Sequence, residues 1–139
     1  GQKLDYLTDM RDAFHKDAPQ KSILVGDLNI APREDDVWDH KKLLKVVSHT
    51  PVEVEALAEV QDSGKWVDVT RADIPEGKLY SWWSYRAKDW DEADKGRRLD
   101  HVWATPDISS SAHSSRVFRA ARGWEKPSDH APVFATFDI

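Results

Sequence analysis

Apolar residues recur at helical spacing in two stretches of the chain. Leu4, Leu7 and Phe14 share one face of the first stretch, which predicts an amphipathic helix. Thr50 and Glu53 form a capping box that opens the second, with proline at the first helical position. A weaker apolar pattern lies between these two stretches. The predicted helices cover residues 3–17, 38–47 and 51–61.

Short apolar runs bounded by polar residues, glycine or proline predict strands. The run Ile23-Leu24-Val25 predicts a buried strand that ends at Asp27. Residues 86–95 mix charges with Trp90 and have no period, which predicts a long exposed loop. The predicted strands cover residues 21–25, 80–85, 99–104, 115–120 and 131–137. Helices and strands together indicate an α/β fold.

The composition fits one globular domain over residues 1–139. A hydrophobic content of 40% with seven tryptophans is typical of a packed core in a chain of this length. The absence of cysteine excludes disulfides, thiolate catalysis and zinc-thiolate sites. Because no apolar run has the length of a membrane span and no signal-peptide pattern opens the chain, we expect a cytoplasmic protein without membrane contact.

Charge is distributed unevenly along the chain, whose net charge is −5. Residues 1–76 carry ten Lys and Arg against sixteen Asp and Glu, whereas residues 77–139 carry ten against nine. Basic residues gather between Arg86 and Arg98, in a segment that is also typical of a solvated surface. The overall charge argues against binding nucleic acid by bulk charge alone. A cationic loop beside an acidic metal site nevertheless suits a phosphodiester, because the loop binds phosphates.

Asp27 and Asn29 follow the first predicted strand and are two residues apart, so their side chains can converge on one site. Asp27 can hold a divalent metal or take a proton from water, and Asn29 can orient that water. The same segment is typical of an ordinary turn in which the aspartate binds its own backbone. The two interpretations stay open at this point.

A second candidate pair is Asp100 and His130. Asp100 begins a predicted strand, where its carboxylate could accept a hydrogen bond from His130, fix its tautomer and raise its proton affinity. A protonated imidazole beside a phosphate stabilises the charge that grows in the transition state. The other five histidines show no metal-ligand spacing, and we interpret them as surface or structural residues.

Four motifs follow one another along the chain: Gly26-Asp27-Leu28-Asn29-Ile30-Ala31-Pro32, Ser81-Trp82-Trp83-Ser84-Tyr85-Arg86, Gly96-Arg97-Arg98-Leu99-Asp100 and Glu125-Lys126-Pro127-Ser128-Asp129-His130-Ala131-Pro132. In this order and at this spacing they resemble the exonuclease III type of abasic (AP) endonuclease, within the endonuclease/exonuclease/phosphatase superfamily. The resemblance covers nearly the whole chain. It implies the C-terminal half of a four-layer α/β sandwich of the DNase I-like kind, with one mainly antiparallel or mixed sheet and helices on one face.

The resemblance also implies a function. Exodeoxyribonuclease III and AP endonucleases hydrolyse DNA phosphodiesters with Mg²⁺ or Mn²⁺ in base excision repair, so the expected partner is double-stranded DNA with abasic sites or 3′ ends. Asp27, Asn29, Asp100 and His130 take catalytic roles by this resemblance, and Asp27, Asn29 and Asp129 take metal-binding ones.

Substrate binding is expected of Trp82, Arg86 and Arg97. The resemblance makes Trp82 a wall of the pocket that accepts a deoxyribose without its base, since an apolar slot selects the missing base by shape. Arg97 departs from the family pattern, which usually has an apolar, pocket-lining residue at this position.

The family's N-terminal half, with its metal-binding Glu, has no counterpart in the sequence. We therefore expect the chain alone to be inactive, and to associate with that missing half or with a second copy. Such a partner would cover a sheet face that includes Leu24, Val102, Ala104, Val133 and Ala135. Two alternatives stay open: a related phosphodiesterase or phosphatase acting on substrates such as inositol phosphates or sphingomyelin, and a non-catalytic interaction fragment.

Overall fold

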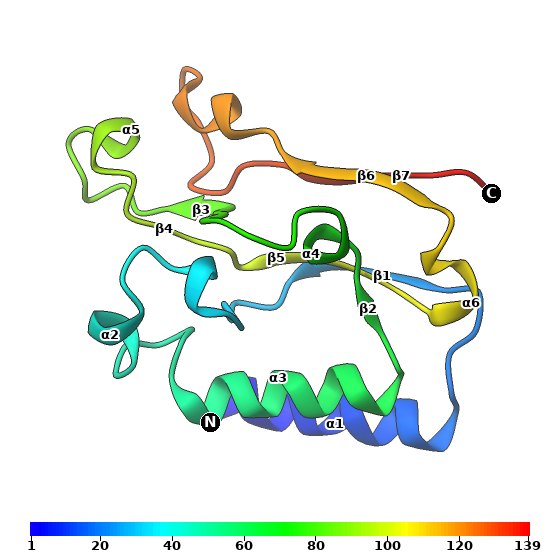
Figure 1. Ribbon diagram of the computed structural model, residues 1–139. Coiled ribbons are helices and arrows are strands. Elements are labelled where there is room, and N and C mark those ends of the chain that lie inside the picture. The colour runs from blue at the N-terminus through cyan, green and yellow to red at the C-terminus, as the bar shows by residue number, and fades with distance from the viewer.

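The computed structural model describes residues 1–139 and has an α/β fold (Figure 1). None of its helices combines the length and the apolar character needed to span a bilayer. The helices are α1 (Gln2–Lys16), α2 (His40–Leu43), α3 (Pro51–Ser63), α4 (Val69–Asp73), α5 (Trp90–Ala93) and α6 (Pro106–Ser109), with 3₁₀ turns η1 (Glu34–Asp36) and η2 (Arg119–Gly123). The strands are β1 (Ile23–Asp27), β2 (Val67–Asp68), β3 (Trp82–Trp83), β4 (Gly96–Arg97), β5 (Asp100–Ala104), β6 (Ala112–Val117) and β7 (Val133–Phe137).

The two long helices lie side by side along one face of the sheet that contains β1, β5 and β2 (Figure 1). Their apolar faces bury Leu7 from α1 and Leu57 and Val60 from α3 against Trp103 of β5. The predicted capping box is present: the Thr50 hydroxyl accepts a hydrogen bond from the Glu53 backbone N–H at the start of α3. The α/β class, with helices on one face of this sheet, is thus confirmed.

All strand pairs are antiparallel, and they form three ladders. The ladders have the strand orders β1-β5-β2, β3-β4 and β6-β7. Single bridges extend the second ladder, because Val37 pairs with Arg97 and Trp82 pairs with His130. In the first ladder the register places Asp27 of β1 opposite Asp100 of β5.

Strand β1 is an edge strand, and it is not buried as the sequence pattern predicts. Only Leu24 turns toward the helices, while Ile23 is 41% exposed and Val25 is 66% exposed. Successive side chains of a strand alternate between the two faces of the sheet, and at β1 only the face of Leu24 is covered, by the helices. The apolar run therefore predicts the strand correctly, but the prediction that this strand is buried is wrong.

The opposite face of β5 is covered by the β6-β7 ladder and α4. Val102 and Ala104 are buried there with Val69, and Val133 and Ala135 of β7 pack against them. The expected bare face is therefore wrong for these residues, and Leu24 lies on the helix side. The strands of the ladder fold over β5 and shield it within the chain itself.

Two predicted strands differ in extent, because residues 80–85 form only the two-residue β3 and the strand predicted at 115–120 is β6, which begins earlier and ends at Val117 before η2. Two other predicted elements differ in type. The predicted helix over residues 38–47 is only α2, because the chain turns after Leu43 through short-range backbone bonds from Val46 and His49. The predicted loop over residues 86–95 contains α5, whose first turn is capped by the Asp89 side chain. Both helices have four residues, too short for a periodic signal.

A buried ion network lies beside the sheet. The Asp36 carboxylate of η1 accepts hydrogen bonds from Arg98 and from Arg71 of α4, and Arg98 also pairs with Asp68. Asp36 and Arg98 are fully buried. Burial opposes ionisation of Asp36, but the hydrogen bonds and charges of both arginines outweigh it and lower the pKa of Asp36. The network fixes the segment that enters β5, and with it the position of Asp100.

Candidate active site

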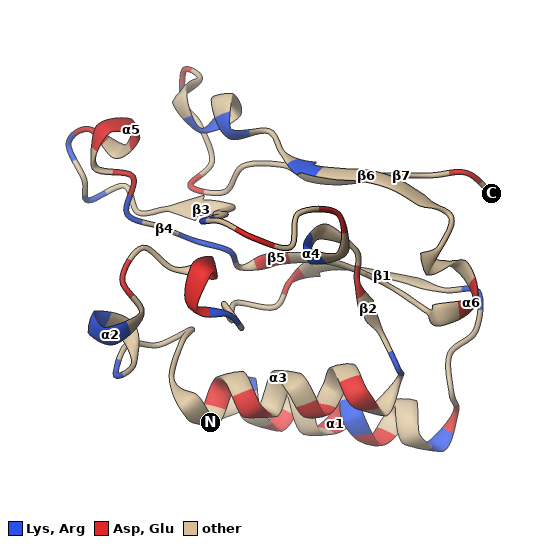
Figure 2. Ribbon diagram, in the orientation of Figure 1, with Lys and Arg blue, Asp and Glu red and all other residues tan.

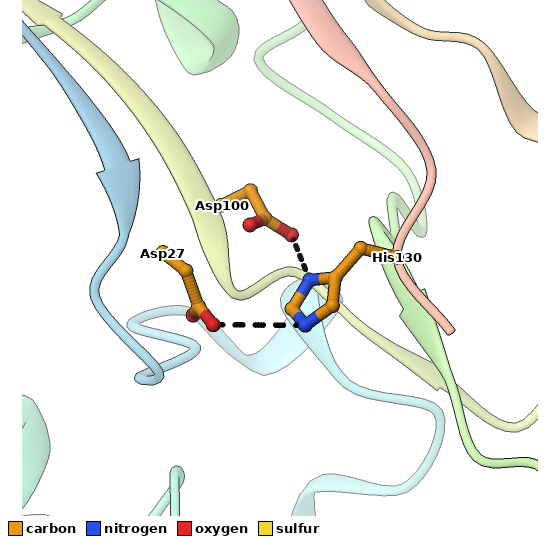
Figure 3. A group of neighbouring side chains, drawn as sticks. All are labelled: Asp27, Asp100 and His130. Atoms are coloured by element: carbon orange, nitrogen blue, oxygen red, sulfur yellow. Dashed lines mark hydrogen bonds and ion pairs between the residues drawn. The ribbon is translucent and has the colours of Figure 1, made fainter. Parts of the chain in front are cut away.

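Three predicted catalytic side chains meet at one point: Asp27, Asp100 and His130 (Figure 3). One ligand atom from each lies within 4.8 Å of the other two. The residues come from β1, from β5 and from the segment before β7, so they are far apart in sequence. The structure thus places Asp27 of the first candidate pair beside both members of the second, Asp100 and His130.

Backbone geometry accounts for this convergence. The β1–β5 register pairs Asp27 with Asp100, and residues paired in an antiparallel ladder share a face. Gly26, with φ of 154°, precedes Asp27 in a backbone region that other residues rarely adopt. His130 is held from the other side by its bridge to Trp82.

His130 is oriented by Asp100. The His130 Nδ1–H donates to Asp100 Oδ2 at 2.7 Å, since an ionised carboxylate only accepts. Nε2 then faces Asp27 Oδ2 at 3.6 Å and Asp129 Oδ1 at 4.0 Å. Burial alone would lower the pKa of His130, but the hydrogen bond to Asp100 and the charges of the three carboxylates outweigh it and raise that pKa. The cluster therefore favours a protonated imidazole, with its Nε2–H available to an anion.

Ser81 ties the elements of the site together. Its buried hydroxyl accepts hydrogen bonds from the backbone N–H groups of Leu99 and Asp100, and its carbonyl accepts from the Ala131 N–H at 2.7 Å. Ser81 thus binds the backbone of Asp100 through its hydroxyl and that of Ala131, the neighbour of His130, through its carbonyl. The sequence gives no signal for this role, because a serine before a strand carries no periodicity or spacing.

The remaining predicted ligands lie at the margin of the cluster. Asn29 contributes its backbone N–H to Asp27 Oδ1 at 2.9 Å, so the turn interpretation of this segment is also correct. The Asn29 backbone has φ of 54°, and the residue is exposed. Asp129 accepts a hydrogen bond from Trp82 Nε1 at 3.0 Å. Metal binding by Asn29 and Asp129 stays a prediction.

Trp82, Arg86 and Arg97 all line one cavity of about 570 Å³. Trp82 is half-buried and Trp83 is buried, as expected for adjacent residues of a strand. Trp82 joins the cavity to the catalytic cluster, since its ring nitrogen binds Asp129. The rest of the lining is Trp38, Trp83, Ser84, Ala87, Trp90 and Lys95. Trp38, Trp90 and Lys95 were not predicted here, because only tertiary contacts place them.

Residues 2–130 match the model of the Endonuclease/Exonuclease/phosphatase family. The chain belongs to this family. It is 26% identical to exodeoxyribonuclease III of Haemophilus influenzae over 97% of this chain and 53% of that relative. The fold matches an AP endonuclease from Archaeoglobus fulgidus with a TM-score of 0.91, at 32% identity over 98% of this chain and 53% of that chain.

A second solved structure is a 3′ phosphatase from Neisseria bound to a product DNA hairpin. It matches with a TM-score of 0.84 and 33% identity, over 96% of this chain and 51% of that chain. The chain spans about half the length of the relatives it matches. The predicted family is confirmed, and the relatives are DNA-processing enzymes by name.

The Endonuclease/Exonuclease/phosphatase family depends on a divalent metal, and the residues of the cluster fit one. Asp27 has a half-exposed carboxylate, which is the hard oxygen ligand that Mg²⁺ and Mn²⁺ prefer. His130 is already engaged with Asp100 through Nδ1. Mg²⁺ commonly uses one or two carboxylates and keeps waters or substrate phosphates as its other ligands. The donor set therefore suits a metal that the substrate helps to hold.

Proposed function

We propose that this chain carries the Asp–His part of a metal-dependent DNA phosphodiesterase, acting at abasic sites and 3′ ends as exodeoxyribonuclease III and AP endonucleases do by name. The observation that carries the proposal is the convergence of Asp27, Asp100 and His130 within 4.8 Å. The names of the relatives favour DNA over inositol phosphates or sphingomyelin. A role in base excision repair and a cytoplasmic location belong to the same proposal.

The proposed step is hydrolysis of a P–O3′ bond. A water oxygen bonds to phosphorus as the P–O3′ bond breaks, O3′ leaves with its strand and takes a proton from solvent water to become a 3′-hydroxyl, and the phosphate stays on the departing 3′ side. Asp27 accepts the proton of the attacking water or holds the metal, and Asn29 orients that water. When bound, Mg²⁺ or Mn²⁺ neutralises charge on the phosphate and lowers the pKa of a bound water.

His130 acts on the phosphoryl oxygen. Its Nε2–H points toward the space beside Asp27, where a phosphate would accept it as negative charge grows. Asp100 keeps the proton of Nδ1 in place and favours the charged imidazole. Asp129 is proposed as a further carboxylate near the metal, held by Trp82.

We also propose that a complementary half-domain, or a second copy of the chain, completes the enzyme. Ile23 and Val25 lie exposed on the face of β1 that carries Asp27, and Asp27 itself is half-exposed. A partner there would cover apolar surface and add ligands to the same phosphate. Sedimentation at micromolar concentration should show a dimer or a complex, and a clean monomer that does not bind the half-domain would reject this part.

A nuclease assay on the complete enzyme tests the proposed function. Duplex DNA with one abasic site and duplex DNA with a recessed 3′ end are each incubated with Mg²⁺, and again with a chelator. We expect cleavage that the chelator abolishes and that Asp27→Ala lowers by orders of magnitude. Cleavage of neither DNA, or an Asp27→Ala variant with normal turnover, would contradict the proposal.

A further inference from the structure

We propose that the cavity beside Trp82 binds a departing nucleotide with its base still attached, so that the site favours release of terminal nucleotides over cleavage at abasic sites. The inference rests on the proposed function, because it names the substrate group of that same site. It follows from the aromatic and cationic lining of the cavity, and Arg97 is its specificity-determining residue.

The lining of the cavity is aromatic and positive. Four of its nine residues are tryptophans, and Arg86, Lys95 and Arg97 supply cations. No carboxylate is among the nine, in a chain with a net charge of −5. Figure 2 shows the basic residues of β4 and of the neighbouring loop on the side of the molecule away from the acidic helices α1 and α3. A ligand that combines a flat ring with a negative charge would be complementary to this surface.

All four tryptophans of the lining have a cation over the ring, and for two of them the cation is itself a lining residue. Lys95 Nζ lies 4.8 Å from the centre of the Trp38 ring, and the Arg97 guanidinium lies 5.1 Å from the centre of the Trp82 ring. Ring faces that accept a cation also stack on nucleobases, and guanidinium groups stack on bases as well. The cavity therefore has several planar groups that a base could contact.

Arg97 lacks a counter-ion. Its Nη1 donates to the Val47 carbonyl and to the Ser48 hydroxyl, both at 3.0 Å, and no carboxylate lies within ion-pair distance. Its Nε is buried without any hydrogen-bond partner. Burial lowers the pKa of Arg97 and outweighs the nearby negative charge of Glu53, which acts in the opposite direction. A phosphate near this group would form the direct ion pair that Arg97 does not have within the chain.

The stacked arginines of the chain differ in their partners: Arg122 lies over Tyr85 and Trp90 and binds only backbone carbonyls, whereas Arg119 is paired with carboxylates. Arg119 lies over Trp83 and Trp90, and it also pairs with Asp91 and Asp94. Arg119 is satisfied within the protein, whereas Arg97, Lys95 and Arg86 form no ion pair. Three cations without an ion pair thus line the same cavity.

The size of the cavity also favours a nucleotide. About 570 Å³ falls in the range of roughly 300–1,000 Å³ that is usual for small-molecule sites. A deoxyribose without its base has no flat ring to stack, so it would leave the tryptophans of the cavity uncovered.

The position of the cavity agrees with the proposed hydrolysis. The phosphate stays on the departing 3′ residue, so the product is a nucleoside 5′-monophosphate when the base is present. The ring of Trp82 lines the cavity. The Nε1–H of the same ring donates a hydrogen bond to the Asp129 carboxylate. One product can thus hold its phosphate at the cluster and its base in the cavity.

Tryptophan fluorescence titration of the 139-residue chain tests the inference without hydrolysis. The ligands are dAMP, deoxyribose 5-phosphate and inorganic phosphate. We expect dAMP to bind most tightly and deoxyribose 5-phosphate about tenfold more weakly, or worse, because it loses one base stack. Arg97→Met should weaken dAMP binding by about tenfold, while Lys16→Met, which removes an exposed cation at the end of α1, should leave it unchanged.

Equal or tighter binding of deoxyribose 5-phosphate would overturn the inference, as would an Arg97→Met variant that binds dAMP normally. Circular dichroism checks the fold of each variant, and Lys95→Met replaces Arg97→Met if the latter unfolds. Failure of the proposed function gives a different result, since the complete enzyme would then cleave no DNA although dAMP still binds. Failure of the inference alone leaves DNA cleavage intact.

Discussion

At the residue scale, the chemistry of the cluster follows from residue type and position. Asp27 at a strand exit, Asp100 at a strand start and His130 in the C-terminal motif were predicted to cooperate, and the structure brings them together. Ser81 could not be predicted, because a buried hydroxyl that accepts two backbone N–H groups leaves no trace in sequence. The motifs thus predicted which reactive side chains lie together, while a contact that depends on a backbone neighbour requires the fold.

His101 is a buried residue with its own pH dependence. Its Nε2–H donates a hydrogen bond to the Ile30 carbonyl at 2.8 Å, and its Nδ1 lies 3.3 Å from Arg98 Nη1. Nδ1 can accept a hydrogen bond from Arg98 only while the His101 ring is neutral. Burial, followed by the charge of Arg98, lowers the pKa of His101 to about 4. As pH falls from about 6.5 toward 4, the unfolded chain takes up a proton that the folded chain refuses, so the free energy of unfolding falls.

We therefore expect the free energy of unfolding to drop on the order of 2–3 kcal/mol over that pH window through His101. Urea denaturation at a series of pH values measures it. His101→Gln should flatten the dependence, whereas His15→Gln, at the exposed end of α1, should not. An unchanged slope in His101→Gln would show that the ring titrates normally.

At the element scale, long elements with a periodic pattern were predicted well and short ones were not. Helices α1 and α3 have 15 and 13 residues, enough for several turns of apolar spacing. Strands β2, β3 and β4 have two residues each, and hydrogen bonds to distant segments define them. Burial was also mispredicted for β1, since a local run of apolar residues does not reveal which strand lies at the edge.

The capping box of α3 provides a test at this scale. The Thr50 hydroxyl accepts from the Glu53 N–H and donates to the Glu53 carboxylate. Thr50→Ala should lower the free energy of unfolding by about 1 kcal/mol, as measured by chemical denaturation. The matched control is Thr8→Ala, whose hydroxyl bonds to the Leu4 carbonyl within α1, and which should cost less. A larger loss in Thr8→Ala would contradict the assigned cap.

At the scale of the whole molecule, the three short ladders are joined by single backbone bridges and by buried side chains rather than by a continuous sheet. The buried network of Asp36, Arg71, Arg98 and Asp68 joins η1, α4 and the entrance of β5. The sequence pattern predicted the α/β class, and the family resemblance supplied the helices on one face and the rest of the architecture. It did not predict that β6-β7 covers β5 within the chain, because that packing depends on pairing between distant segments.

The central claim is that Asp27 and His130 act on one and the same phosphate. The most direct measurement is a double-variant cycle in the complete enzyme, with single-turnover cleavage of one duplex DNA at saturating Mg²⁺. Asp27→Ala and His130→Ala should each slow cleavage by orders of magnitude, and the double variant should be little slower than the worse single variant, because groups that act as a unit are not additive. Losses that multiply in full, or a single variant that cleaves at the normal rate, would contradict the account.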